Sequence, residues 1–214
     1  MIIIGIDLSG PSNHQDTVAS AFYMEEFLTL KKTVAGASDH DILNLVQECL
    51  TEGEVIIGID APLSYQDGGG DRPHDKALRH IMKVGGLNGS SIMTPTMTRM
   101  VYITLRGIQL TRMLSELSEA ITILEVHPGA AIGLRMKDPA PALSYKKDSS
   151  MRAEIFFWLQ RQGMNGLTEK NAATTHSIDS CGAALAAWHY TASDKQPVWS
   201  YEQTSAAHPY VMCC

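Results

Sequence analysis

The chain opens with Met1-Ile-Ile-Ile-Gly-Ile-Asp-Leu-Ser-Gly10, a run of β-branched apolar residues that is closed by an aspartate. A short run of this kind, without polar alternation, predicts a central strand over residues 2–7 that is buried on both faces. The design recurs in Val55-Ile-Ile-Gly-Ile-Asp60-Ala-Pro-Leu63, and Ile121-Thr-Ile-Leu-Glu125-Val-His-Pro128 ends its strand in a glutamate. If the three strands are neighbours in one sheet, Asp7, Asp60 and Glu125 meet beyond the strand ends, where open α/β sheets place their ligands.

The remaining pattern predicts an α/β protein. Strands at 17–24 and 27–33 follow the first strand closely enough to pair with it as an antiparallel meander. The strand at 54–60 is expected to be parallel to the first, because a helix separates it from the meander. Helical spacing of apolar residues predicts helices at 39–49, 73–83, 96–117, 149–162 and 176–188, and the tail after Trp199 is expected to add a short edge strand.

Length and composition indicate one domain over residues 1–214, with a helical and loop insertion at about 61–118. No apolar run approaches the roughly 20 residues that span a bilayer, so no membrane partner is expected. The N-terminal apolar run is cut off by Asp7, which favours a strand over a secretion signal. The four cysteines show neither zinc-ligand spacing nor a disulfide framework, which indicates a reducing, cytoplasmic setting.

The net charge is −6, which by itself counts against a nucleic-acid-binding protein. The charge is unevenly distributed, however, because residues 72–112 contain seven basic side chains and only one acid. This stretch is either an anion-facing surface or the solvated faces of two helices, and the sequence leaves both interpretations open.

Several motifs together resemble the family catalogued as domain of unknown function 429, whose members are predicted nucleases. They are Ile4-Gly-Ile-Asp7, Ile57-Gly-Ile-Asp60-Ala-Pro, Arg72-Pro-His-Asp75 with Leu78-Arg79, Arg106-Gly107, Glu125-Val-His-Pro128, and Asp179 followed by an Ala-rich helix. The resemblance covers nearly the whole chain. It implies a ribonuclease-H-like fold, the superfamily of Holliday-junction resolvases and transposases, with a mixed five-stranded sheet in the order 3-2-1-4-5 and helices on both faces.

The resemblance also implies a metal-dependent hydrolase that cleaves phosphodiesters with two Mg²⁺ or Mn²⁺ ions. Such a reaction requires hard oxygen ligands that hold the metals roughly 3.5–4 Å apart. In the superfamily pattern the aspartate of the first strand bridges the metals, and Asp7 matches it. Asp60, Glu125 and Asp179 are the expected remaining catalytic residues and metal ligands.

The expected partner is nucleic acid or a small nucleotide. Because clustered acids cannot attract a phosphodiester by themselves, basic side chains are expected beside the metals. The expected substrate-binding residues are Arg72, Arg79, Arg99, Arg106, His127 and His176. Stabilising hydrogen bonds within turns are an equally good explanation for the two histidines.

Two alternatives remain open from the sequence. A phosphotransferase of the actin and sugar-kinase type also has a first strand that ends in Gly-x-Asp, but it needs a phosphate-binding hairpin and a duplicated core. Leu8-Ser-Gly-Pro matches that hairpin only in part, and 214 residues cannot hold two cores. The second alternative is a non-catalytic domain of the same fold that binds a ligand.

Overall fold

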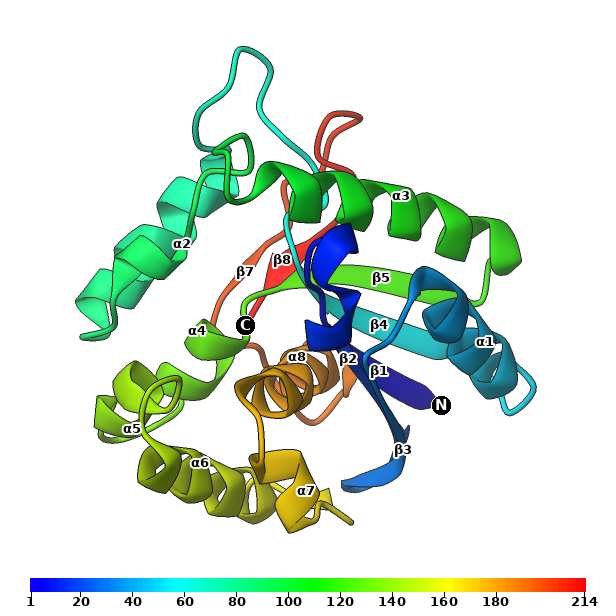
Figure 1. The fold of residues 1–214 in the computed structure, drawn as a ribbon, viewed down its shortest axis with the longest axis vertical. Coiled ribbons are helices and arrows are strands. Elements are labelled where there is room, and N and C mark those ends of the chain that lie inside the picture. Colours follow the sequence, from blue (N-terminus) through cyan, green and yellow to red (C-terminus); the bar gives the residue numbers. More distant parts are fainter.

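The computed structural model describes residues 1–214, and a mixed β-sheet with helices on both faces lies at its centre (Figure 1). The strands are β1 (Ile2–Asp7), β2 (Val18–Met24), β3 (Leu28–Ala35), β4 (Val55–Asp60), β5 (Ile121–Val126), β6 (Met164–Asn165), β7 (Ser200–Tyr201) and β8 (Met212–Cys213). The helices are α1 (Asp39–Leu50), α2 (Pro73–Val84), α3 (Val101–Leu117), α4 (Pro128–Gly133), α5 (Ala140–Ser144), α6 (Ser149–Arg161), α7 (Glu169–Ala172) and α8 (Thr175–Thr191), with 3-10 helices η1 (Pro11–Asp16) and η2 (Gly89–Ser91).

The sequence located the long elements closely. Each of the strands β1 to β5 and the helices α1, α2 and α6 ends within two residues of its expected limits, and α8 extends three residues further than expected. Helix α3 begins at Val101 rather than at residue 96, because residues 94–100 form tight turns in which the amide of Met97 donates to the carbonyl of Thr94. Helix α4 was not predicted, although its first residue, Pro128, is of a type well suited to the first position of a helix.

The sheet has eight strands in the order β6-β3-β2-β1-β4-β5-β8-β7, not the five that were expected. Three two-residue strands account for the difference, with β6 added beside β3 and the pair β8 and β7 added beside β5. The strands β1, β4 and β5 at the centre are parallel, and β2 is antiparallel to β1. The carboxyl ends of β1, β4 and β5 therefore lie at the same edge of the sheet.

The apolar side chains of β1 alternate between two cores. Ile2, Ile4 and Ile6 join a core beneath α1 and α3, whereas Ile3 joins the larger core beneath α4, α6 and α8. Figure 1 shows the same division, with α1 and α3 on one side of the sheet and α8 on the other. Both faces of the first strand are thus buried, as its unbroken apolar sequence predicts.

Helix α8 lies unusually close to the sheet because β1 and β4 present glycines to it. Gly5 pairs with Gly58 across the two strands, and a Cβ atom added to Gly5 would lie 2.0 Å from the carbonyl oxygen of Ser180. The same addition to Gly58 would place a Cβ atom 2.6 Å from the carbonyl oxygen of Ala183. The repeated Gly-Ile-Asp motif therefore serves packing first, and it fixes which face of the sheet its aspartates occupy.

This close approach leads to a prediction about stability. We expect Gly5→Ala to lower the free energy of unfolding by about 2 to 3 kcal/mol, because the added methyl group forces α8 away from the sheet. Gly10→Ala is the matched control, since its nearest neighbour would be 4.0 Å away and its φ of −63° suits alanine. Urea denaturation followed by circular dichroism measures both variants, and equal midpoints would contradict the proposed packing.

None of the helices combines the length and the apolar character that a membrane span needs.

Candidate active site

A cavity of about 490 Å³ lies at the carboxyl ends of the central strands. Asp7 and Asp60 line it, as does Glu125, and Lys146 and Lys147 come from the segment that follows α5. Three of the four predicted carboxylates therefore border one cavity, at the edge of the sheet where ligands of α/β proteins usually bind.

Asp7 and Asp60 are brought together by the register of the sheet. They are direct partners in the parallel pairing of β1 and β4, and each follows its glycine by two residues, so both lie on the face that α8 covers. Helix α8 contributes His176 and Asp179 near its start. The Nδ1 atom of His176 lies 2.7 Å from Oδ2 of Asp7, which ties the end of β1 to the helix.

Asp179 is 3% exposed and has a partner for each carboxylate oxygen. The hydroxyl group of Tyr145 donates to Oδ1, and the Nζ atom of Lys146 lies 3.1 Å from Oδ2. The sequence pattern predicts neither partner, because Tyr145 and Lys146 follow a short helix without a periodic pattern and lie more than thirty residues from Asp179.

Asp7 and Asp60 share an environment that disfavours their charge. Burial raises the pKa of Asp7 to about 7, although the hydrogen bond from His176 opposes this shift and Asp179 adds to it. Burial, Asp7 and Asp179 together raise the pKa of Asp60 well above its ordinary value. The hydrogen bond to Asp7 in turn raises the pKa of His176. Asp7 and Asp179 each have polar side-chain partners, whereas Asp60 makes no hydrogen bond or ion pair. The aspartates therefore outnumber the cationic side chains beside them.

Glu125 does not join the aspartates, because it points to the other face of the sheet. It pairs with Ile59 rather than with Asp60, and its neighbour Ile123 belongs to the core beneath α1 and α3. Both of its oxygens bind Arg72, at 2.5 Å from Nη2 and 2.8 Å from Nη1, and Oε2 also accepts the amide of Leu63. The structure thus leaves no free oxygen on the glutamate that was expected to complete the metal shell.

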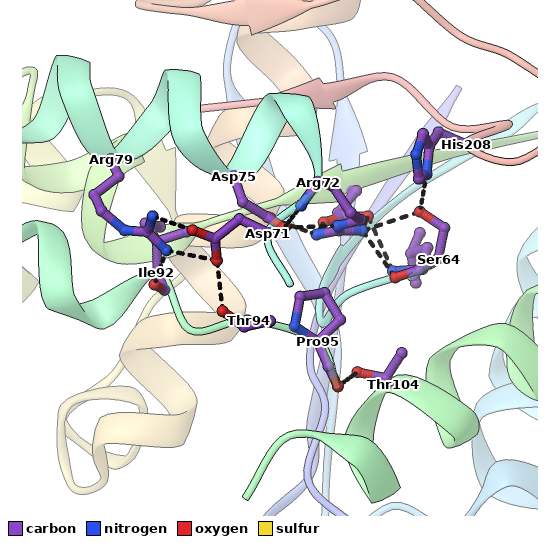
Figure 2. A network of polar contacts seen from close by, with 12 residues as sticks. Ser64, Asp71, Arg72, Asp75, Arg79, Ile92, Thr94, Pro95, Thr104 and His208 are labelled. Carbon is purple, nitrogen blue, oxygen red and sulfur yellow. Dashed lines mark hydrogen bonds and ion pairs between the residues drawn. The ribbon is translucent and has the colours of Figure 1, made fainter. Parts of the chain in front are cut away.

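Arg72 is the centre of the polar network in Figure 2 rather than a residue that faces the substrate. It is 1% exposed and holds Glu125 and Asp75 together, while its Nη1 atom donates to the hydroxyl and the carbonyl of Ser64. Ser64 lies 2.9 Å from Nδ1 of His208, so the network reaches the C-terminal loop. Burial opposes the charge of Arg72, but Glu125 and Asp75 raise its pKa.

The other predicted arginines lie outside the cavity. Arg79 pairs with Asp71 at 2.6 Å, and the buried Arg106 bonds to Asp39 and to the oxygens of Ser9, Thr17 and Ala37. Arg99 is exposed at a turn before α3. Of the four arginines that were expected beside the carboxylates, Arg72 alone lines the cavity, where it is bound to Glu125. The contacts of Arg79 and Arg106 stabilise the fold instead.

His127 lines the cavity, but its imidazole already has a role in the backbone. Its Nδ1 atom accepts the amide of Ala130 and caps α4, and burial lowers its pKa to about 4. His127 therefore remains neutral at physiological pH. His176, which touches Asp7 directly, is the predicted histidine that the structure places beside the aspartates.

A second group of side chains has the geometry of a metal site. The ligand atoms of His74, Asp75 and Glu125 all lie within 4.8 Å of one another, which is not found for the three aspartates. The guanidinium group of Arg72 lies between the two acids of this group, however, since it donates to both Asp75 and Glu125. Burial and Arg72 also lower the pKa of His74 to about 4. The guanidinium thus takes the place that a cation would occupy.

The comparisons with known proteins agree with the motifs. A family model described as "Protein of unknown function (DUF429)" matches residues 5–199. Neither the curated proteins nor the solved structures contain a significant match to the chain.

Proposed function

The chain belongs to the DUF429 family of proteins of unknown function, and we propose that it is a hydrolase of phosphodiesters, a nuclease in the broad sense, that uses Mg²⁺ or Mn²⁺. The observation that carries this proposal is the placement of Asp60. Its carboxylate lines the cavity without a partner, and burial together with the charges of Asp7 and Asp179 raises its pKa. Three clustered carboxylates that outnumber their cations are typical of a site that binds a divalent ion.

The donor set fits such an ion. Asp7, Asp60 and Asp179 offer only carboxylate oxygens, which are the ligands that Mg²⁺ and Mn²⁺ prefer. Glu125 is excluded from this set by its two bonds to Arg72. The metal site we propose is therefore the three aspartates, one fewer than the sequence indicated.

The protein's own residues prepare the site for a phosphate. Tyr145 fixes the orientation of Asp179, and His176 does the same for Asp7. The side chain of Lys146 is 62% exposed, so it can leave Asp179 and bind a phosphate oxygen when another cation takes its place. A divalent ion at the aspartates would polarise a phosphoryl oxygen and lower the pKa of a bound water molecule.

The arrangement of the central strands also supports the proposal. Strands β3, β2, β1, β4 and β5 are neighbours in that order, which is the succession of a ribonuclease-H-like sheet, and the three aspartates come from β1, β4 and a helix packed on them. We therefore propose that the short strands β6, β7 and β8 are additions to a ribonuclease-H-like core.

Metal binding can be tested by thermal unfolding. We expect Mn²⁺ at 100 times its Kd to stabilise the protein by about 2.7 kcal/mol, which raises the Tm by roughly 5 to 10 °C for a chain of this length. Asp60→Asn is expected to remove this increase. The same variant should melt at a higher temperature than the wild type without metal, because an unpaired carboxylate has been neutralised.

Asp67→Asn is the matched control for this experiment, since Asp67 is exposed in the glycine-rich loop and outside the cavity. It should keep the full response to Mn²⁺. A wild-type Tm that does not respond to Mn²⁺ or Mg²⁺, or an undiminished response in Asp60→Asn, would refute the proposed metal site.

A further inference from the structure

The cavity is lined by two chemically different groups of side chains. Asp7, Asp60 and Lys146 are charged, whereas an apolar wall comes from α2, from the start of α3 and from the segment between these helices. The wall consists of Met82, Leu87, Ile92, Met93, Met100 and Ile103. A phosphate needs none of these contacts, so the apolar wall must serve a different part of the ligand.

The wall is held in place by a dedicated polar network. Arg79 pairs with Asp71 and donates from Nη2 to the carbonyl of Ile92, and the hydroxyl of Thr94 donates to the same Asp71 at 2.5 Å. Figure 2 shows these groups converging beside α2. Arg79 thus positions the backbone on either side of Met93, which explains how a segment with little regular structure forms a defined surface.

The wall also carries polar groups at its rim. Asn88 and Ser91 line the cavity next to Leu87 and Ile92, and the side-chain amide nitrogen of Asn88 makes no hydrogen bond within the protein. A heteroaromatic ring has two apolar faces and hydrogen-bonding atoms along its edge, so a ligand with such a ring would match this combination of side chains. Methionine suits such a ring, because its sulfur is polarisable and its side chain adapts to a flat surface.

We propose that the cavity binds one unpaired nucleoside phosphate, with the phosphate at the aspartates and Lys146 and the base against Met93 and Met100. This inference rests on the proposed hydrolysis of phosphodiesters and specifies its substrate. The volume of about 490 Å³ lies within the range of small-molecule pockets, which is roughly 300–1,000 Å³. A base that is stacked within a duplex cannot reach the wall, whereas a free nucleotide or an unpaired residue of a strand can.

Equilibrium titration of the wild-type protein with adenosine 5′-monophosphate and ribose 5-phosphate tests the inference, at one fixed concentration of Ca²⁺. We expect the nucleotide to bind about tenfold more tightly, because only the nucleotide buries a ring against the wall. A single-stranded oligonucleotide and its blunt duplex form the second pair, and the single strand should bind at least about tenfold more tightly.

A variant with Met93→Ser and Met100→Ser should reduce the affinity for adenosine 5′-monophosphate to that for ribose 5-phosphate, which itself should not change. Met97→Ser is the matched control, since Met97 is 48% exposed and does not line the cavity. If the double variant fails to fold, the two ligand pairs on the wild type decide the question alone.

Equal affinities for the two small phosphates and no difference between strand and duplex would overturn the inference. Tight binding of the single strand without binding of the free nucleotide would support it and assign the unpaired nucleotide to a strand. The Mn²⁺-induced rise in Tm separates the two proposals. A rise in Tm without tighter binding of the nucleotide than of ribose 5-phosphate would refute only the inference about the base. Absence of both the rise and any cleavage would refute the proposed hydrolase activity.

Discussion

Replacement of Arg72 by methionine is expected to lower the free energy of unfolding by about 3 to 5 kcal/mol, because it leaves two buried carboxylates without their cation. Arg72 is 1% exposed, and its partners Asp75 and Glu125 are 1% and 3% exposed. Water cannot replace the guanidinium at this depth. The loss can be measured by urea denaturation at neutral pH.

Arg79→Met is the matched control, since this arginine also pairs with an aspartate, Asp71, but is only partly buried. Its loss should cost about 1 kcal/mol, as expected for a pair that solvent partly screens. In the double variant with Arg72→Met and Glu125→Gln, part of the lost stability should return, because one unpaired charge has been removed. A cost for Arg72→Met as small as that for Arg79→Met would show that the network in Figure 2 is not a stabilising centre.

The sequence predicted the elements and the two aspartates because both depend on local patterns. Short apolar runs specify the six-residue strands β1 and β4, and the same Gly-Ile-Asp motif closes both strands. The two motifs align in the parallel pair because Gly5 and Gly58 must both lie against helix α8. Asp7 and Asp60 therefore occupy the same face, as expected.

The sequence could not show that Glu125 lies on the other face. Its strand ends in Leu-Glu-Val, which resembles the other two strand ends, but the register pairs Glu125 with Ile59 instead of Asp60. A shift of one residue moves a side chain to the opposite face of a sheet. The strand lacks the Gly-x-Asp spacing of β1 and β4, and this absence was the available signal.

The sequence also gave no indication of which charges pair. The high density of arginines between residues 72 and 112 was consistent with a surface for nucleic acid, yet Arg72 binds a glutamate 53 residues away and Arg106 binds an aspartate 67 residues away. Such partners are determined by tertiary contacts. The positive charge that borders the aspartates comes from Lys146, outside that stretch.

Asp7→Asn is expected to reduce metal-dependent cleavage by roughly 10²- to 10⁴-fold, because a metal ion is worth several kcal/mol of transition-state stabilisation. Asp7 is the best aspartate for this test, since it lines the cavity and its change to asparagine keeps the shape of the side chain. Binding of nucleotide should fall by much less than cleavage, because Lys146 and the apolar wall remain. Activity is measured with Mn²⁺ on single-stranded, duplex and branched DNA and on single-stranded RNA.

Asp16→Asn provides the matched control for this loss of activity. Asp16 lies 4.0 Å from Nε2 of His176, the histidine whose other nitrogen contacts Asp7, but its side chain is 54% exposed and does not line the cavity. Asp16→Asn therefore removes the same charge near His176 as Asp7→Asn does, but outside the cavity. It should leave cleavage nearly intact. If both variants lose activity equally, His176 rather than the metal ligands controls the reaction; if Asp7→Asn cleaves like the wild type, the aspartates are not the catalytic site.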